Sequence, residues 1–130
     1  MESGKYYRRE LGQRGEDIAC RLLQNMGHVI LERNWRSGHL EIDIISYAAD
    51  GIHFVEVKTR RENIQAPPQD SVDWKKQARV TRAAQNFLRY GKGLPYRDYE
   101  CMFDIVAVTF CGDKYWTEWI PQAFIPIHIR

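Results

Sequence analysis

Three acidic side chains and one lysine lie within two apolar runs that flank a turn between residues 39 and 58. Glu41 and Asp43 lie in the run H-L-E-I-D-I-I-S-Y, and Glu56 and Lys58 lie in the run I-H-F-V-E-V-K. If both runs are strands, their period-2 alternation places all four side chains on one face. Like charges that face each other across paired strands are destabilising, so this face needs a compensating group. A divalent cation held by oxygen ligands would provide it, and Mg²⁺ typically takes one or two carboxylates plus water and phosphate oxygens.

The turn A-A-D-G joins the two runs and decides which of these side chains face each other. A turn centred on Ala-Asp places Asp43 opposite Glu56, and Glu41 opposite Lys58. A turn centred on Asp-Gly, which a type I′ geometry prefers, places Asp43 opposite Lys58 instead. Both registers keep the four side chains on one face, so the sequence predicts a shared site in either case. The opposite face of the first strand is then predicted to carry Leu40, Ile42 and Ile44.

An amphipathic helix is predicted over residues 10–26, because its apolar residues recur with a 3.6 period. Residues 1–9 are expected to form a loose basic arm before it. Glu16 lies at the edge of the apolar stripe, where it is either a favourable charge in the first turns or a carboxylate aimed at the hairpin. Gly12 and Gly15 each cost a helix roughly 1 kcal/mol relative to alanine, so both indicate a close approach of another backbone.

A second helix is predicted over residues 71–90, with Asp70 or Ser71 as its N-cap. Its apolar stripe is expected to contain Trp74, Ala78, Val80, Ala84, Phe87 and Leu88. A basic stripe follows a 4-3-4-3 spacing and contains Lys75, Arg79, Arg82, Asn86 and Arg89. This stripe is either a solvated outer face or a surface that contacts successive phosphates of a nucleic acid. Gln77 lies close to the apolar edge and could face the site.

The remaining segments complete a single domain of 130 residues. Residues 28–34 are predicted to form a strand before the hairpin. Residues 60–70 contain a Pro-Pro pair, which indicates a loop at the mouth of the site. Residues 101–110 form a near-continuous apolar run, typical of a central strand covered on both faces. Residues 114–120 are predicted to form the last strand.

Asp104 and the C-terminal tail leave alternatives open. Asp104 lies within the apolar run C-M-F-D-I-V-A-V-T-F. It is either a buried acid paired with an arginine or part of the outer shell of the site. The tail that starts at Pro121 packs either on the sheet or on a second subunit.

Charge is unevenly distributed along the chain, although the net charge is only +2. Residues 58–97 contain ten Lys or Arg and three Asp or Glu, whereas residues 37–57 contain four acids and no Lys or Arg. An acidic site beside a basic segment is typical of a protein that grips a polyanion while a metal acts on it. The bland alternative is a basic segment that merely solvates a helix.

The cysteines and histidines exclude several classes of protein. Cys20, Cys101 and Cys111 form no CxxC pair and lie in apolar runs, which favours buried thiols in a reduced, cytoplasmic protein. The four histidines are scattered, which argues against a zinc cluster. No apolar run approaches the ~20 residues of a membrane span, so no membrane association is expected.

The order helix, strand, hairpin, helix, strand, strand, with Glu16, Asp43 and the E-V-K run, resembles the restriction-endonuclease-like core of the PD-(D/E)XK nucleases. More closely, the chain is similar to the bacterial YraN-like family of uncharacterised proteins, related in fold to archaeal Holliday-junction resolvases. The stretches that carry the resemblance are L-G-Q-R-G-E-D-I-A, E-R-N-W-R, E-I-D-I-I, F-V-E-V-K-T-R, K-K-Q-A-R-V and M-F-D-I-V-A-V. Family members usually have glycine at the position of Leu40 and arginine at that of Met102; neither is an expected ligand.

This resemblance implies an α/β (α+β) domain with a central mixed sheet of about five strands flanked by helices. It also implies that Asp43, Glu56 and the backbone carbonyl of Val57 hold Mg²⁺ or Mn²⁺, with Glu16 completing the shell directly or through water. Lys58 would orient or activate the attacking water and stabilise charge at phosphorus. Glu41 ranks below these, because it could simply pair with Lys58. The residues expected to bind nucleic acid are Lys75, Gln77, Arg79, Arg82 and Arg89, together with Arg60 and Arg61.

Two functions are compatible with these residues. The first is a metal-dependent endonuclease that hydrolyses phosphodiester bonds in structured or branched DNA, with DNA a better candidate than RNA. The second is a nucleic-acid-binding or scaffolding protein that keeps the nuclease fold without cutting. A homodimer is a further expectation, because cutting a junction requires two sites.

Overall fold

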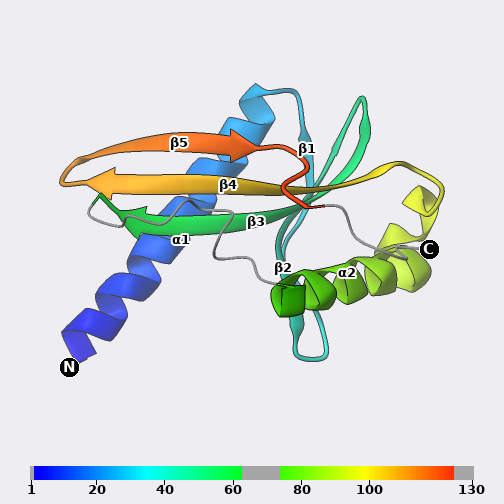
Figure 1. Ribbon diagram of the computed structural model, residues 1–130, viewed down its shortest axis with the longest axis horizontal. Coiled ribbons are helices and arrows are strands. Elements are labelled where there is room, and N and C mark those ends of the chain that lie inside the picture. The colour runs from blue at the N-terminus through cyan, green and yellow to red at the C-terminus, as the bar shows by residue number, and fades with distance from the viewer. Residues whose placement is uncertain (1, 63–73, 125–130) are drawn as a thin grey trace.

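A computed structural model of the chain describes residues 2–62 and 74–124, with side chains from residue 9 onward. Helix α1 (Glu2–Asn25) precedes three strands, β1 (Val29–Ser37), β2 (Leu40–Ala48) and β3 (Gly51–Arg61). Helix α2 (Trp74–Arg89) and the short 3₁₀ helix η2 (Gly91–Tyr96) lead to the last two strands, β4 (Cys101–Cys111) and β5 (Lys114–Ile120) (Figure 1).

The five strands form one mixed sheet in the order β1-β2-β3-β4-β5. β3 and β4 run parallel, and the other three neighbouring pairs run antiparallel. A parallel pair requires a crossover connection, and α2 lies in that connection. In β4 every residue between its two terminal cysteines is buried, as expected for a strand covered on both faces. The predicted α+β fold class, with about five strands and flanking helices, is confirmed.

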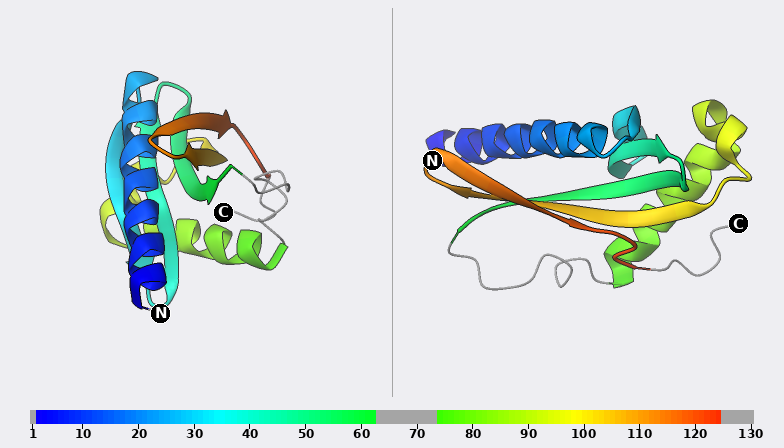
Figure 2. Two further views of the ribbon diagram at one scale, coloured as in Figure 1. Left: turned by 90° about the vertical axis from the view of Figure 1, so that its left-hand side faces the viewer. Right: turned by 90° about the horizontal axis from the view of Figure 1, so that it is seen from above.

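The two helices cover opposite faces of the sheet, as the two views of Figure 2 show. On the α1 face, apolar side chains of the helix pack against those of β2, β3 and β4, among them Leu23, Ala19, Ile44, Val55 and Val106. On the α2 face, the core contains Val80, Phe87, Ile45, Phe54 and Phe103. Each large side chain buried in this way stabilises the fold by roughly 1.5–3 kcal/mol. Side chains of the sheet are therefore held in place between the two helices.

The hairpin of β2 and β3 adopts the first of the two predicted registers. Ala48 pairs with Gly51 and Ile44 pairs with Val55, so the turn is centred on Ala-Asp and the type I′ alternative is wrong. Gly51 permits this arrangement, because it has a φ of +138° and a Cβ there would overlap the backbone of Glu100. Pairing ends at Ile44 and Val55, and beyond this point β2 turns toward α2 while β3 continues beside β4 (Figure 1).

The end of β2–β3 pairing also changes which face the side chains of β2 occupy. Leu40 and Ile42 pack in the core on the α2 face, whereas Ile44 packs on the α1 face. The prediction that all three share one face is therefore wrong. The opposite strand is irregular at the same level, because Asn34 has a φ of +51°. A strand that bends and twists away from its neighbour does not keep a strict two-residue alternation.

Helix α1 departs from its prediction at its start. It begins at Glu2, so the segment expected to be a loose arm is helical from residue 2. The apolar period that predicts the helix is found only where the helix packs against the sheet. It starts at Leu11, the first buried residue described in α1. Gly15 does permit a close approach, but of a side chain and not of the predicted backbone, because a Cβ there would overlap the side chain of Thr59 on β3. Gly12 does not, because a Cβ there would meet nothing within 4 Å.

Helix α2 buries a stripe that differs from the predicted one at its N-terminal end. The buried residues are Val80, Ala83, Ala84, Phe87 and Leu88, while Trp74 and Ala78 are exposed. One turn before Val80 the stripe contains Lys76, so apolar character alone misplaced the face. The predicted N-cap, Asp70 or Ser71, lies outside the described residues, as does the predicted loop from residue 63 onward. Arg60 and Arg61 belong to β3 and not to that loop.

Several smaller expectations are also decided by the structure. β1 extends to Ser37, beyond its predicted end. The three cysteines are free thiols, but only Cys20 is buried, and Cys111 is exposed at the end of β4. The tail packs on the sheet as far as Phe124, whose ring lies 5.1 Å from that of Phe103. No helix among the described residues is long and apolar enough to cross a membrane.

Candidate functional site

Two of the predicted acids meet where β2 and β3 stop pairing. The last residues of β2 and β3 that pair with each other are Ile44 and Val55. Asp43 comes directly before Ile44 on β2, and Glu56 comes directly after Val55 on β3. Asp43 Oδ2 accepts a hydrogen bond of 2.8 Å from the backbone N–H of Val57, which bridges the separating strands. Glu16 reaches the same place from α1, and its charge acts on Asp43. We call Glu16, Asp43 and Glu56 the carboxylate cluster.

Negative charge is destabilised within the carboxylate cluster. Burial and, after it, repulsion by the Glu56 carboxylate raise the pKa of Asp43 to about 7, and Glu16 adds to the rise. The Val57 N–H and the Lys76 ammonium oppose the rise without cancelling it. A carboxyl with a pKa near neutrality, held between other carboxylates, is typical of a functional site. It is also the environment that a divalent cation relieves.

Two lysines surround Glu56 from different elements. Lys76 Nζ, on α2, lies 2.9 Å from Glu56 Oε1, and Lys58 Nζ, on β3, lies 3.5 Å from the same oxygen. Only about a tenth of the Glu56 side chain is exposed. Lys58 was predicted in the site and is found there. Lys76 was missed, although a 3.6 period places it one turn before Val80 on the sheet-facing stripe, a signal that could have found it.

Glu16 owes its position to the close approach of α1 and β3. The neighbouring Gly15 lies against the side chain of Thr59, so the helix itself contributes no side chain between the two elements at this level. Glu16 Oε1 is buried and has no hydrogen-bond partner, the single such side-chain atom in the part of the chain that the structure describes. Its nearest cation, Arg33 Nη2, is 3.8 Å away and lies closer, at 2.7 Å, to Asp17. Of the two readings of Glu16, the carboxylate aimed at the hairpin is the one that the structure favours.

Glu41 lies outside the carboxylate cluster. It forms an ion pair of 3.0 Å with Arg36, its partner residue across the β1–β2 pair. It pairs neither with Lys58, as the predicted register allowed, nor with the other acids. The bend of β2 between Ile42 and Ile44 explains this result, because it breaks the alternation that put Glu41 and Asp43 on one face.

The basic residues predicted to contact nucleic acid form an exposed surface near this cluster. Along α2, the exposed basic side chains are Lys75, Arg79, Arg82 and Arg89. Asn86 is not part of this outer surface, because its Nδ2 donates a hydrogen bond of 3.0 Å to Ser37 Oγ. Gln77 is half-buried, next to Lys76 in sequence. Arg60 and Arg61 follow Lys58 along β3, and alternation places Arg60 on the face of Glu56 and Lys58.

Asp104 belongs to a second polar cluster, near the hairpin turn. Its Oδ2 lies 2.5 Å from His53 Nδ1, and its Oδ1 accepts the backbone N–H of Gln122 at 2.9 Å. His53 Nε2 lies 2.7 Å from Asp50 Oδ1. The His28 ring lies 4.5 Å from the His53 ring, tilted by 57° to it, and His28 Nδ1 forms a hydrogen bond of 2.8 Å with Ser46 Oγ. We call these five residues, His28, Ser46, Asp50, His53 and Asp104, the histidine cluster.

The histidine cluster corrects two expectations. Asp104 was expected either to pair with an arginine or to lie in the outer shell of the site. It pairs with a histidine instead, on the α1 face beyond Val55. The histidines were expected to be scattered, yet the sheet brings two of them together. Burial opposes a charge on His53, but the hydrogen bonds that its ring donates to Asp104 and Asp50 outweigh burial and raise the pKa of His53.

The fit of the carboxylate cluster to a metal ion rests on its donors. Its ligands would all be oxygens, which suits Mg²⁺ or Mn²⁺, and Glu16 Oε1 has no hydrogen bond and only the 3.8 Å ion pair with Arg33. Among the described residues, however, no three His, Cys, Asp or Glu side chains already converge closely enough to hold an ion. Lys76 and Lys58 both contact Glu56 Oε1 in this arrangement, so an ion would bind Glu56 through its other carboxylate oxygen or displace a lysine.

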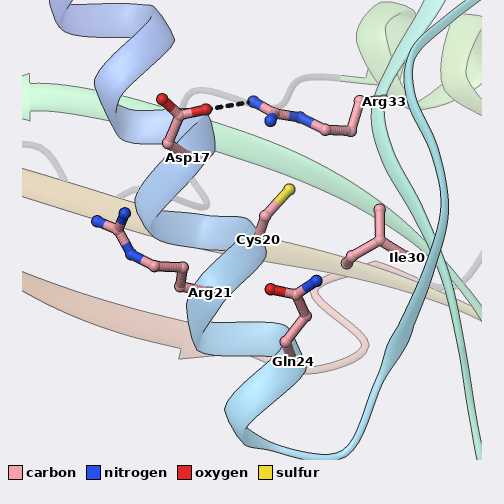
Figure 3. A pocket seen from close by; sticks show the side chains of 6 residues that line it. All are labelled: Asp17, Cys20, Arg21, Gln24, Ile30 and Arg33. Carbon is pink, nitrogen blue, oxygen red and sulfur yellow. Dashed lines mark hydrogen bonds and ion pairs between the residues drawn. The ribbon is translucent and has the colours of Figure 1, made fainter.

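A pocket of about 300 Å³ lies on the other side of α1, facing β1. Its lining includes Cys20, Gln24 and Ile30, as well as the Asp17–Arg33 ion pair that borders Glu16 (Figure 3). Burial raises the pKa of the Cys20 thiol, so this cysteine is not an activated nucleophile. The pocket contains none of the predicted site residues. The carboxylate cluster remains the candidate site.

Comparison with known proteins identifies the family. Residues 15–108 match the Uncharacterised protein family UPF0102, a stretch that contains every residue of the carboxylate cluster. The chain belongs to this family. It is the YraN family that the sequence blocks resemble, so that prediction is confirmed.

Relatives within UPF0102 align over most of their length. The UPF0102 protein of Nitratidesulfovibrio vulgaris (strain DP4) is 44% identical over 117 residues, which cover 90% of this chain and 85% of that protein. That of Bacteroides thetaiotaomicron is 37% identical and covers 90% and 93%, respectively. That of Clostridium perfringens is 36% identical over 122 residues and covers 92% and 98%.

Among solved structures, the Ca²⁺ complex of Pyrococcus furiosus SfsA is similar to this chain with a TM-score of 0.39 and 15% identity. The match covers 88% of this chain and 63% of that chain. A likeness of this size does not establish a shared fold. The restriction-endonuclease-like assignment therefore stays a prediction.

Proposed function

We propose that this UPF0102 protein is a metal-dependent endonuclease that hydrolyses phosphodiester bonds in structured or branched DNA. The observation that supports this proposal most is the carboxylate cluster. Its three acidic side chains lie close together, largely shielded from solvent, and one of their oxygens has no hydrogen bond. A structural ion-pair ladder would not leave Glu16 Oε1 without a hydrogen-bond partner or raise the pKa of Asp43 to about 7. The resemblance to the PD-(D/E)XK nucleases assigns the same residues.

In this proposal Asp43, Glu56 and the carbonyl of Val57 hold Mg²⁺ or Mn²⁺, and Glu16 completes the shell. When bound, such an ion lowers the pKa of water and neutralises phosphate oxygens. Asp43 is oriented by the Val57 N–H, which leaves its second oxygen for a ligand. Lys58 is placed beside Glu56 and stabilises negative charge that develops on the phosphate. The basic side chains of α2 and the end of β3 bind the phosphate backbone.

The test is cleavage of duplex, forked and four-way DNA with Mg²⁺ or Mn²⁺. We expect Asp43→Ala and Lys58→Ala to reduce cleavage by roughly 10²–10³-fold, the usual loss when a charge-stabilising group is removed. Glu41→Ala is the matched control, because it removes an acid from the same strand outside the cluster and should leave cleavage unchanged. Equal residual cutting by the wild type, Asp43→Ala and Lys58→Ala would indicate contamination and rule out the endonuclease.

A second candidate is a nucleic-acid-binding or scaffolding protein that does not cut. The observation that favours it is the Lys76–Glu56 ion pair, at 2.9 Å, which neutralises a would-be metal ligand with a group of the chain itself. In that case DNA binding remains, its affinity falls steeply with salt, and metal has no effect. Exchanging Arg79 and Arg82 for alanine should weaken binding across all sequences under either proposal.

A further inference from the structure

The two edges of the sheet differ in a way that matters for assembly. β1, at one edge, is interrupted by a register shift between Ile30 and Glu32 and by the left-handed residue Asn34. β5, at the other edge, pairs with β4 over its full length without a register shift and contains neither proline nor glycine. The sheet described here has no strand beyond β5 (Figure 1). An unbroken edge presents a row of backbone N–H and C=O groups to an added strand.

The exposed side chains of β5 are aromatic at the centre of the strand and oppositely charged on either side of it. Tyr115 and Trp116 are 45% and 49% exposed. Alternation places Trp116 on one face of the strand together with Lys114 and Glu118, which stand two residues before and two residues after it. Both charged side chains are exposed. The strand thus carries an aromatic centre with opposite charges at equal distances on either side.

We propose that β5 pairs antiparallel with β5 of a second copy of this chain, about a two-fold axis at Trp116. In this register Trp116 faces its own counterpart, and Lys114 faces the partner's Glu118. Two ion pairs and one aromatic pair then form together, and no like charges face each other. A two-fold interface requires this kind of self-complementary surface. The proposal concerns assembly alone and does not depend on whether the chain cleaves DNA.

Other registers of the same pair are less favourable. An axis at Thr117 would place Lys114 opposite the partner's Ile120, and Trp116 opposite the partner's Glu118. Both ion pairs would be lost, and each charge would face an apolar side chain. A single strand pair buries little surface, at the lower end of stable interfaces near ~1,200 Å². We therefore expect a dimer that exchanges with the monomer as concentration changes.

Charge reversal on β5 tests the proposal by sedimentation velocity of the full chain over a range of concentrations. The wild type should shift toward twice the monomer mass as concentration rises. Glu118→Lys alone, or Lys114→Glu alone, places like charges opposite each other twice and should weaken dimerisation by roughly tenfold or more. The double variant Lys114→Glu/Glu118→Lys restores both ion pairs and should dimerise as the wild type does.

A mixture of the two single variants provides the sharpest outcome. In a mixed pair, every lysine of one chain faces a glutamate of the other, so the mixture should form heterodimers although each variant alone stays monomeric. Asp98→Lys, an equal change of charge at an exposed residue outside β5, should leave dimerisation unchanged. A wild type that stays monomeric, or a dimer that the single reversals do not weaken, would overturn the proposal. Far-UV circular dichroism of each variant establishes that it is folded.

Discussion

The carboxylate cluster and the histidine cluster both contain residues of β2 and β3, the first just beyond the end of their pairing and the second within it and at the turn. In the histidine cluster, both ring nitrogens of His53 and both oxygens of Asp104 have partners. In the carboxylate cluster, the charges of Glu56 and Glu16 repel that of Asp43, and one buried oxygen has no hydrogen bond. Buried polar groups that are fully paired stabilise a fold, whereas unpaired ones cost stability unless a ligand satisfies them. The difference indicates a structural role for the histidine cluster, and it is the reason that the carboxylate cluster is the candidate functional site.

The largest expected effect is the loss of stability when the histidine cluster is broken. Asp104→Ala leaves His53 with the exposed Asp50 as its remaining acidic partner and frees the N–H of Gln122. We expect the free energy of unfolding to fall by roughly 3–5 kcal/mol, the usual cost of removing one member of a buried charged pair. Urea denaturation at pH 6 measures it. A loss below about 1 kcal/mol would contradict a structural role.

The same variant should show a defined pH dependence. The pKa of His53 is raised in the folded state, so the protonated ring stabilises the fold through its pairing with Asp104. This stabilisation is fully present below the unfolded pKa of about 6.5 and is lost as pH rises through the folded pKa. The gap in stability between the wild type and Asp104→Ala should therefore narrow at alkaline pH. A gap that does not change with pH would show that His53 carries no charge in the fold.

The opposite sign is expected in the carboxylate cluster without metal. Asp43→Asn keeps an oxygen for the Val57 N–H but removes the charge. Since the pKa of Asp43 rises from 3.8 to about 7 on folding, the wild type loses stability as pH rises between these values. In EDTA at pH 8 we expect the variant to be more stable by about 1–4 kcal/mol, and to lose this advantage below pH 4. Destabilisation at pH 8 would place Asp43 among structural residues.

A bound metal ion should stabilise the carboxylate cluster by compensating its negative charge, and so remove its difference from the fully paired histidine cluster. Mn²⁺ at about 100 times its dissociation constant should stabilise the wild type by about 2.7 kcal/mol. Thermal unfolding with and without Mn²⁺ measures this shift. Asp43→Asn should show little or no shift, whereas Glu41→Gln, an acid of the same strand outside the cluster, should shift as the wild type does. Equal shifts in all three proteins would show that the ion binds elsewhere.

The smallest effect concerns how α1 brings Glu16 to the cluster. Gly15→Ala overlaps Thr59 and should cost roughly 1–3 kcal/mol, and it should also weaken the Mn²⁺ shift. Gly12→Ala is the matched control: a Cβ there meets nothing within 4 Å, so the variant should gain up to about 1 kcal/mol from helix propensity. Thermal unfolding separates the two. A tolerated alanine at residue 15 would mean that the close approach is not needed.

Much of this arrangement could be predicted from local pattern. Alternation located β2 and β3, a near-continuous apolar run located β4, and the 3.6 period located the packed parts of both helices. The run E-V-K and the acid at position 43 marked the site, because charges in a buried strand are conspicuous wherever they occur. Asp104 was conspicuous for the same reason. Its partner could not be predicted, because His53 lies 51 residues away in sequence and meets it through the parallel pairing of β3 with β4.

The sequence by itself determined the element types, the family and the identity of the acids and lysines that could act on a phosphate. These depend on side-chain chemistry and on short-range periodicity, both of which are readable from a single chain. The tertiary structure decided that Glu41 leaves the cluster, that Lys76 enters it and that Asp104 serves the opposite end of the hairpin. The first depends on where β2 parts from β3, the second on which turn of α2 meets the sheet, and the third on the pairing of β3 with β4. The helical period places Lys76 on the stripe that faces the sheet, but the partners of all three residues are fixed by long-range packing.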